Sequence, residues 1–485
     1  MKNVYKRIRF DKKILIVGYG SVCRCTLPIL LQHIDVPYKN ITIIDFEDKR
    51  TVLKKWTDRG IRFFRERITP ETLDRILSSH LESNGLLIDL AWNIETGEML
   101  KWCHNHNVLY VNTSVEEWDS LGDIFKKNPF EKSLYFRQMK LRQLTKDWRN
   151  DSTTAVVDHG ANPGLISHFT KQALVDITRR LIKDKKVTKS TSKNLIGFIE
   201  ERNFAELAMA LGIKVIHCSE RDTQITNNPK KVNEFVGTWS MEGLREEGTA
   251  PAEMGWGTHE KELPKNAQVP PYGPKNQIFL PQMGINTWVK SWIPEQEIIG
   301  MVIRHGEAFG ISDRLTVRKN GKPVYRPTVH YAYMPCDETL SSLYELRCRN
   351  YDLQPRLRIL KDHEIVSGAD ILGALLMGHK YNAWWTGSIL NIKEARRLRP
   401  GQNATTIQVA MGVVGAVMWM LENPKKGLCL PDDLPYDYIL KIAKPWLGRF
   451  VSKPYDWTPL KNRKVFFREN PDSKPDSSDP WQFKN

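Results

Sequence analysis

The sequence of 485 residues has few cysteines, and none of its seven forms a Cys-x-x-Cys pair. Without such pairs or any regular spacing, a zinc ribbon is excluded and a disulfide scaffold is disfavoured. Cys103, His104 and His106 form a short cluster, but no further ligand completes it. We therefore predict no metal site, interpret this cluster as the surface of a helix end, and expect a reduced protein of the cytoplasm.

Long hydrophobic runs are also missing. The first ten residues are basic, but the apolar run that follows ends at Val17, which is too short for the core of a signal peptide. The most membrane-like stretch, residues 407–421, contains Gln408 and falls short of the ~18 residues that a spanning helix requires. We interpret it as a buried helix and expect neither export nor a membrane partner.

Acidic residues are in the minority. The 72 Lys and Arg residues against 56 Asp and Glu residues give a formal net charge of +16. Such a charge favours anionic partners, for example nucleotide phosphates or nucleic acid, but does not choose among them. Hydrophobic residues make up 41% and charged residues 26%, so the chain is globular, and its length allows about two or three domains.

From residue 13 to about residue 114, short apolar runs alternate with amphipathic stretches. This alternation is typical of a parallel sheet with helices on both faces. It predicts strands at 14–17, 41–45, 86–90 and 108–111, separated by helices at 22–33, 70–81 and 97–106. The predicted fold class is thus α/β, with a doubly wound Rossmann domain over residues 1–155.

The remainder of the chain has a different texture. Residues 156–385 contain strand-like segments joined by long loops, which predicts an α+β domain that binds the substrate. Residues 386–450 contain two apolar helical runs, at 404–421 and 436–446, expected to pack back on the first domain. Residues 451–485 are rich in Pro, Ser, Asp and Lys toward the end and are interpreted as a tail.

A glycine-rich turn follows the first predicted strand. Gly18 and Gly20 lie between this strand and a helix that begins near Ser21 and Val22. In this position the backbone can approach a pyrophosphate, and free N–H groups of the helix can bind it. Cys23 stands where the usual fingerprint has Gly or Ala, so the helix–strand contact must admit a thiol.

An acidic residue suited to the ribose hydroxyl groups ends the second predicted strand. Asp45 lies 25 residues beyond Gly20, which favours NAD over NADP as the cofactor. Lys49 and Arg50 lie close by and could accept a 2′-phosphate, so NADP stays open at this point. The later strands are followed by polar residues at the carboxyl edge, where Asp89, Thr113 and Ser114 are predicted to contact the cofactor and Asn93 the substrate.

Several short sequence motifs, here called sequence words, occur between residues 13 and 446 in the same order as in bacterial-type homospermidine synthases, and they resemble the motifs of that family. These synthases are relatives of saccharopine dehydrogenase. These words are Asp158-His159-Gly160-Ala161-Asn162-Pro163-Gly164, Glu220-Arg221-Asp222-Thr223-Gln224, Thr238-Trp239-Ser240 with Glu247-Gly248, Gly255-Trp256-Gly257-Thr258-His259 and Arg304-His305-Gly306-Glu307. The resemblance implies a homodimer, with the middle domain as its dimerisation domain.

The resemblance also implies a reaction. Hydride transfer from putrescine to bound NAD gives an imine, a second putrescine replaces ammonia to form a new imine, and the retained NADH reduces this new imine to homospermidine. Spermidine can stand in for the first putrescine, with release of diaminopropane. A dicationic substrate requires acidic and aromatic groups in its pocket, although the protein as a whole is basic.

Matching motifs assign candidate residues by resemblance. The catalytic candidates are Trp239, Glu220, Glu247, Asn162 and His305, and the candidates for the diamine tunnel or its entrance are Glu117 and Asp370. Trp239 is similar to an aromatic platform for cations, and the two glutamates to carboxylates that accept protons from amines.

Each candidate also has a plainer interpretation. Trp239 could be a core residue, His305 a structural histidine, Asn162 a turn residue before Pro163, and each carboxylate a surface charge. Two assignments stay open on the sequence alone, because Glu246 adjoins Glu247 and because Glu364 competes with Asp370 for the entrance.

Two other functions remain as alternatives. Another enzyme of the saccharopine dehydrogenase group, such as carboxynorspermidine synthase, would need arginines for its carboxylate-bearing substrate. A nucleic-acid-binding protein with a redundant Rossmann fold would account for the charge of +16. However, the basic residues are scattered rather than arranged in a stripe, so we expect no nucleic-acid partner.

Overall fold

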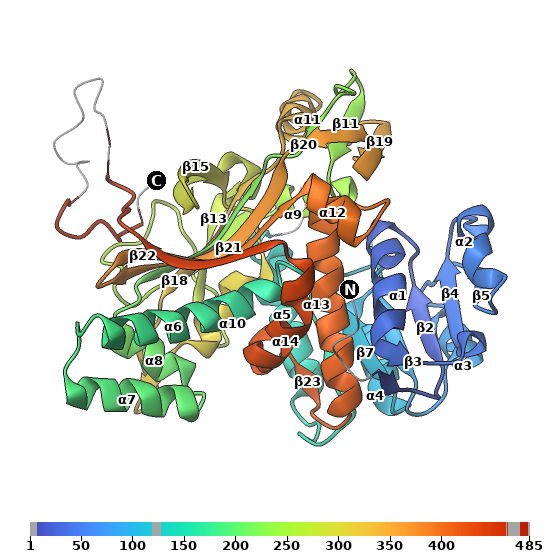
Figure 1. The fold of residues 1–485 in the computed structure, drawn as a ribbon, viewed down its shortest axis with the longest axis horizontal. Helices are drawn as coiled ribbons and strands as arrows, with labels where there is room; N and C mark the ends of the chain where they lie inside the picture. Colours follow the sequence, from blue (N-terminus) through green and yellow to red (C-terminus); the bar gives the residue numbers. More distant parts are fainter. Residues whose placement is uncertain (1–6, 119–127, 462, 464–475, 484–485) are drawn as a thin grey trace.

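The computed structural model describes residues 7–118, 128–461, 463 and 476–483. Within these residues the chain forms two large sheets with helices around them (Figure 1). The first sheet has strands in the order β23-β8-β7-β6-β2-β4-β5, all paired in parallel. These strands are β2 (Ile14–Val17), β4 (Ile41–Asp45), β5 (Arg62–Arg65), β6 (Leu86–Asp89), β7 (Leu109–Asn112), β8 (Ala155–Val156) and β23 (Leu428–Cys429).

This strand order is that of a Rossmann domain, with the first strand, β2, between β4 and β6 at the point where the order reverses. The four central strands are fully buried and almost wholly apolar, as expected for strands covered on both faces. The flanking helices are α1 (Ser21–His33), α2 (Arg50–Thr57), α3 (Leu73–His80) and α4 (Thr96–Asn105). The predicted Rossmann domain is confirmed, although α2 and β5 were not predicted.

The second sheet is mixed and forms the α+β domain. Its main path is β13-β12-β18-β9-β21-β22-β24, and the hairpin β14–β15 joins it through β18. The strands are β9 (Val215–Asp222), β12 (Pro251–Gly255), β13 (Gln277–Met283), β14 (Trp288–Ile293), β15 (Gln296–Met301), β18 (Thr328–Met334), β21 (Ala369–His379), β22 (Asn382–Asn391) and β24 (Arg449–Tyr455). The shorter pairs are β1 (Ile8–Arg9) with β3 (Ile34–Asp35), β10 (Ile225–Thr226) with β20 (Ile365–Ser367), β11 (Glu234–Gly237) with β19 (Arg356–Ile359), and β16 (Val317–Lys319) with β17 (Lys322–Tyr325).

Helices connect and cover the two sheets. They are α5 (Leu134–Thr145), α6 (Leu165–Lys183), α7 (Lys189–Glu200), α8 (Phe204–Leu211), α9 (Met241–Thr249), α10 (Gly306–Arg314), α11 (Asp337–Cys348), α12 (Ile392–Leu398), α13 (Ala404–Glu422) and α14 (Tyr436–Ala443). In Figure 1, α13 lies beside α1, and it also contacts β7, β8 and β21, so this C-terminal helix packs against both sheets.

The apolar helix α13 is longer than the apolar run in the sequence. Its 19 residues and high hydropathy would be enough to cross a membrane, but nearly all of it is buried inside the protein. Asn403 begins the helix, since its side chain accepts a hydrogen bond from the backbone N–H of Thr406 at 2.8 Å. Packing of α13 against α1 and α14 makes it a core helix, as the sequence predicted.

Two predicted boundaries need correction. The boundary at residue 385 falls inside β22, and the segment beyond residue 450, interpreted as a tail, contributes β24 to the second sheet. Trp457 and Trp481 in that segment are buried against the sheet. The polar composition concealed this role, because a strand at the edge of a sheet needs few apolar side chains and tolerates Pro454.

Candidate active site

The glycine-rich turn lies at the carboxyl end of β2 and is shaped for close backbone approach. Gly18 has a φ of +89°, and a Cβ atom there would lie 2.9 Å from the carbonyl oxygen of Leu90, so only glycine fits. A Cβ at Gly20 would meet nothing within 4 Å. The first turn of α1, which begins with Ser21 and Val22, has no side-chain cap, so its N–H groups can bind a phosphate.

Asp45 ties this turn to the end of β4. Its Oδ2 accepts a hydrogen bond from the backbone N–H of Tyr19 at 2.7 Å, and its Oδ1 accepts one from Glu47 at 2.8 Å. Each carboxylate oxygen can still accept a further bond from a ribose hydroxyl group. The nearby cations are engaged elsewhere, since Lys49 pairs with Glu47 and Arg50 with Asp48.

The other predicted cofactor residues follow β6 and β7. Asp89 is buried, and its carboxylate accepts hydrogen bonds from the Tyr110 hydroxyl at 3.0 Å and the backbone N–H of Ala91 at 3.2 Å. Burial raises the pKa of Asp89 to about 7. Asp89 is thus a buried residue at the end of β6, whereas Asn93, Thr113 and Ser114 lie in the turns that follow and are partly accessible. Contacts of these residues with a ligand stay predictions.

Glu220 lies on β9 in the interior of the α+β domain. Its Oε2 accepts hydrogen bonds from the Asn162 amide at 2.7 Å and from the Tyr331 hydroxyl. The Asn162 amide also lies 2.5 Å from the Tyr331 hydroxyl oxygen. Burial raises the pKa of Glu220 to about 7, so this carboxyl group can exchange a proton near neutral pH. The structure thus brings the predicted residues Asn162 and Glu220 together.

Two further buried carboxylates adjoin Glu220. Asp222 follows it on the same face of β9. Asp370 lies on the neighbouring strand β21, directly opposite Asp222. The hydroxyl groups of Thr238 and Thr405 donate to Asp222 at 2.7 Å and Asp370 at 2.6 Å. Burial, with the nearby Glu220 and Asp222, raises the pKa of Asp370 well above its ordinary value. These groups can hold protons or neutralise a cation.

Glu364, the competitor of Asp370, lies elsewhere. Its carboxylate is ion-paired with Arg358 at 2.8 Å and accepts a hydrogen bond from the backbone of Lys361. A carboxylate held in this way stabilises the turn before β20. The structure therefore favours Asp370 for the interior site, although its place beside Glu220 is deeper than the predicted entrance.

His305 lies at the start of α10 between two glutamates. Its Nδ1 is 3.1 Å from Glu307 Oε2, its Nε2 is 3.4 Å from Glu247 Oε2, and its ring centroid is 4.4 Å from that of Tyr331. Burial would lower the pKa of His305, but Glu307 and Glu247 outweigh it and raise the pKa to about 10. His305 is thus an imidazolium at neutral pH, linked through Tyr331 to Glu220.

Asp158 completes this cluster from the strand end after β8. It is buried with a φ of +65°, and a Cβ atom on Gly306 would come within 2.1 Å of its Oδ2. Burial and the neighbouring Glu307 raise the pKa of Asp158 to about 8. A non-glycine residue held at positive φ among ionisable groups is typical of a functional site.

The structure resolves the ambiguity between the adjacent glutamates Glu246 and Glu247. Glu246 is buried and ion-paired with Arg304 and with Arg137 at 2.6 Å. Burial would raise the pKa of Glu246, but the two guanidinium groups lower it to about 2. Glu246 is thus a fixed anion, and Glu247 is the one that reaches His305.

Trp239 lies just before α9 and is half-buried. Its indole N–H donates to the Tyr333 hydroxyl at 2.9 Å, and Tyr333 stacks on Tyr331 with ring centroids 5.2 Å apart. Because Tyr331 also donates to Glu220, the aromatic residue and the carboxylate belong to one connected group. Glu220, Asn162 and His305 thus contact Tyr331, and Trp239 joins them through Tyr333.

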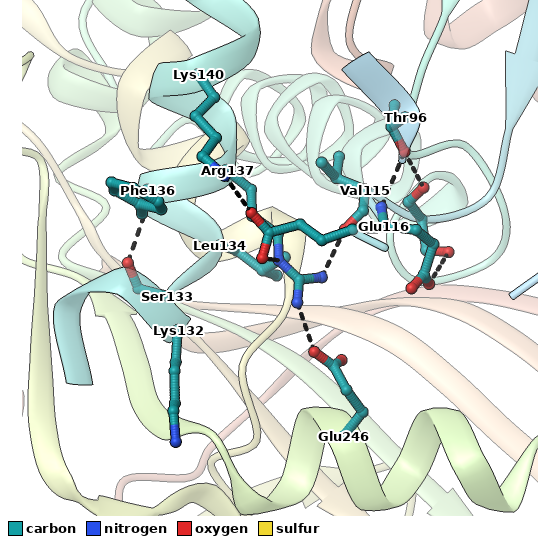
Figure 2. Close-up of polar contacts among 12 residues, drawn as sticks. Thr96, Val115, Glu116, Lys132, Ser133, Leu134, Phe136, Arg137, Lys140 and Glu246 are labelled. Atoms are coloured by element: carbon teal, nitrogen blue, oxygen red, sulfur yellow. Dashed lines mark hydrogen bonds and ion pairs between the residues drawn. The ribbon is translucent and has the colours of Figure 1, made fainter. Parts of the chain in front are cut away.

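Glu117 lies apart from that group, after β7. Its carboxylate pairs with Lys140 at 2.5 Å and with Arg137 at 3.6 Å. Figure 2 shows Lys140 and Arg137 projecting from the same helix, α5, with Arg137 reaching Glu246. A cavity of about 220 Å³ opens here, and its ionisable lining consists of Glu95, Glu98, Lys101, Glu116, Glu117, Arg137 and Lys140.

Several residues of these clusters were not singled out from the sequence. Asp158, Asp222 and Glu307 lie within the quoted sequence words, so the motifs themselves were a usable signal. Tyr331 and Glu116 carried no signal, because a tyrosine in a strand and a second glutamate beside Glu117 have many ordinary roles. Among the described residues, no group of three or more His, Cys, Asp or Glu side chains is arranged so that it could hold a metal ion.

Comparison with known proteins places this geometry in a family. A model of the saccharopine dehydrogenase NADP binding domain matches residues 14–156, and one of the saccharopine dehydrogenase C-terminal domain matches residues 160–455. The chain is 38% identical to a homospermidine synthase of Mesorhizobium japonicum, over 97% of this chain and 95% of that protein. It is 40% identical to a homospermidine synthase of Blastochloris viridis, over 99% of this chain and 98% of that protein. The chain belongs to the homospermidine synthase family.

Solved structures agree with membership of the homospermidine synthase family. The structure of a homospermidine synthase from Legionella pneumophila in complex with NAD has a TM-score of 0.86 and 36% identity, over 98% of both chains. Yeast saccharopine dehydrogenase, with 13% identity and a TM-score of 0.50, shares the fold alone. The family and fold class predicted from the sequence are confirmed.

Proposed function

We propose that the protein is an NAD-dependent homospermidine synthase, which joins two putrescines with release of ammonia. The observation that carries this proposal is the buried carboxylate of Glu220, held by Tyr331 and Asn162 beside Asp222 and Asp370, in a chain of this family. Buried acids next to aromatic rings suit a dicationic amine, because both groups stabilise positive charge.

The residues around the glycine-rich turn fit NAD. The open space at Gly20 and the uncapped N-terminus of α1 would hold the pyrophosphate, and Asp45 the adenosine ribose. When bound, NAD supplies a hydride acceptor that later becomes a hydride donor. The pairing of Lys49 with Glu47 and of Arg50 with Asp48 supports NAD over NADP, since each cation already has a carboxylate partner.

The residues of the α+β domain manage the protons of the amines. An amine must be neutral before it can lose a hydride or attack an imine, so a nearby group must accept its proton. Glu220, with a pKa of about 7, is suited to this role, and Asn162 orients its carboxylate. The carboxylate of Glu247, paired with His305, is placed to accept the proton of the second amine. Trp239 would face the iminium ion, whose charge its ring stabilises.

The alternative within the dehydrogenase group is less well supported. A substrate with a carboxylate requires an arginine in the pocket, as for carboxynorspermidine synthase. The buried guanidinium groups near the site, Arg137 and Arg304, are both ion-paired with Glu246. The pocket that remains is acidic, which favours a polyamine substrate.

Three finer assignments belong to the same proposal. We expect spermidine to replace putrescine as aminobutyl donor, with release of diaminopropane. We also expect a homodimer built mainly through the α+β domain, and a cytoplasmic location, which the seven free cysteines support. Despite the charge of +16, we expect the protein to bind neither nucleic acid nor a membrane.

A single reaction tests the proposal. Putrescine with a catalytic trace of NAD should give homospermidine and ammonia in equal amounts over many turnovers, measured by mass spectrometry, while NADH stays near the enzyme concentration. Deuterium on the carbon beside the putrescine nitrogen should reappear in the product. Accumulation of NADH in step with consumed diamine would instead identify an ordinary amine dehydrogenase.

A further inference from the structure

Lys140 stands at the mouth of the cavity beside Glu117. Its ammonium group is 2.5 Å from Glu117 Oε1 and 4.9 Å from the centre of the Phe136 ring. A cation between a carboxylate and an aromatic ring is in the kind of environment that binds amine ligands. The chemical resemblance is close, because the lysine side chain is a 4-aminobutyl group, which is putrescine without its second amino group.

The two cations that hold Glu117 differ in mobility. Arg137 is 5% exposed and is fixed by Glu246 and by the carbonyl oxygen of Val115 at 2.7 Å. The side chain of Lys140 is 48% exposed, so its ammonium can move into water at little cost. Of these two cations, Lys140 is therefore the one that can exchange with an ammonium group from solution.

The cavity next to this pair is built to take positive charge. Four glutamates line it, Glu95, Glu98, Glu116 and Glu117, against three cations, one of which is Lys140. Glu116 accepts a hydrogen bond from Ser114 at 2.7 Å on one oxygen, whereas its other oxygen, Oε2, is buried and has no hydrogen-bond partner in the described part of the chain. A buried carboxylate oxygen without a partner is a position for a donor from a ligand.

The cavity also adjoins the interior site. The charges of Glu246 and Glu247 on α9 act on Glu116, and burial together with them raises the pKa of Glu116 to about 7. Glu247 in turn pairs with His305. Arg137 provides the geometric link, because it lines the cavity and pairs with Glu117 at 3.6 Å and with Glu246 at 2.6 Å, next to Glu247 on α9.

We propose that the ammonium group of Lys140 binds the carboxylate of Glu117 in place of a substrate ammonium group, until an incoming diamine displaces it. This inference rests on the proposed function, since it takes a polyamine as the ligand. Competition with Lys140 then sets the diamine concentration at which the cavity is occupied. It also excludes monoamines, which bind more weakly. Its effect falls on substrate binding, not on the chemical step.

The test compares two lysines of one cavity. Lys140→Met removes the ammonium but keeps the length of the side chain, and Lys101→Met removes the same charge from a lysine that is not paired with Glu117 in the described structure. We expect Lys140→Met to lower the KM for putrescine about threefold to fivefold with kcat near the wild-type value, and Lys101→Met to have a clearly smaller effect. Lys140→Arg, which can form a bidentate pair with Glu117, should raise the KM.

A binding measurement separates this inference from the proposed function. Calorimetric titration of the NADH-loaded proteins with putrescine, in which no hydride can leave the substrate, should give the same order of affinities as the KM values. If the wild-type protein binds putrescine but forms no homospermidine, the proposed function is wrong, but the titration still tests whether Lys140 competes with putrescine. The role of Lys140 is wrong if Lys140→Met binds putrescine as tightly as the wild type or more weakly. It is also wrong if Lys140→Met and Lys101→Met gain the same affinity for putrescine.

Discussion

Trp239 is expected to act on cationic intermediates rather than on folding. Trp239→Phe keeps a weaker aromatic face but loses the hydrogen bond to Tyr333, so it should retain much of the activity, whereas Trp239→Ala should lose roughly 2- to 30-fold in kcat/KM. Steady-state kinetics with putrescine measure both. Trp288→Ala, at a tryptophan that is 42% exposed, is the matched control and should change little.

Thermal unfolding distinguishes the two interpretations of Trp239. If Trp239→Phe and Trp239→Ala unfold at the same lowered temperature and lose activity together, Trp239 is a core residue and the cation–π role is wrong.

Glu220 is expected to set the pH dependence of amine oxidation. Its folded pKa of about 7 lies above the usual value, so below pH 7 the carboxyl group is protonated and can no longer accept a proton from the amine. The wild-type kcat/KM should therefore fall as the pH decreases through about 7. Glu220→Gln should lose about 10²- to 10⁴-fold in kcat/KM and lack this inflection.

Binding of NAD controls for damage to the fold in this variant. The affinity for NADH should stay unchanged, because Glu220 lies on β9, in the other domain. An inflection near pH 7 that survives in Glu220→Gln would assign the titration to another group, with Asp158 as the first candidate because its pKa is about 8.

At the scale of elements, the turn between β2 and α1 depends on the end of β4. Asp45→Ala removes the acceptor for the N–H groups of Tyr19 and Glu47 as well as the ribose contact. We expect NADH to bind about tenfold more weakly and its advantage over NADPH to narrow. Fluorescence titration of both nucleotides measures this change.

Asp45→Asn separates the two contributions. The amide oxygen of asparagine can keep one backbone hydrogen bond while the negative charge is lost, so this variant should keep more affinity for NADH than Asp45→Ala and admit NADPH more readily. Equal binding of NADH and NADPH by the wild-type protein would contradict the preference for NAD.

Prediction of elements succeeded where local periodicity was strong. In the first domain the strands 14–17 and 41–45 were predicted at their observed bounds, because a buried parallel strand is a continuous apolar run. The exposed strand β5 and helix α2 lack such a run and were missed. β24 was missed for the same reason, since none of its residues is fully buried and it joins the sheet through backbone pairing with β22.

At the scale of the whole molecule, we expect a homodimer joined through the α+β domain. This domain exposes large apolar side chains, among them Ile225, Val232, Tyr344, Leu357 and Val366, which a partner could cover. Light scattering at low micromolar concentration should give twice the chain mass of 56.2 kDa. A fully active monomer would show that the prediction is wrong.

The sequence by itself determined the Rossmann domain, the glycine-rich turn with Asp45, the buried helix α13 and, by resemblance, the family. These features are encoded locally, in the period of apolar residues and in short sequence words. Only the tertiary structure decided that Glu247, and not Glu246, reaches His305. It also decided that Asp370, and not Glu364, lies beside Glu220, and that Lys140 pairs with Glu117. The physical reason is that a carboxylate's role depends on the charges packed against it, and those come from residues far away in the chain.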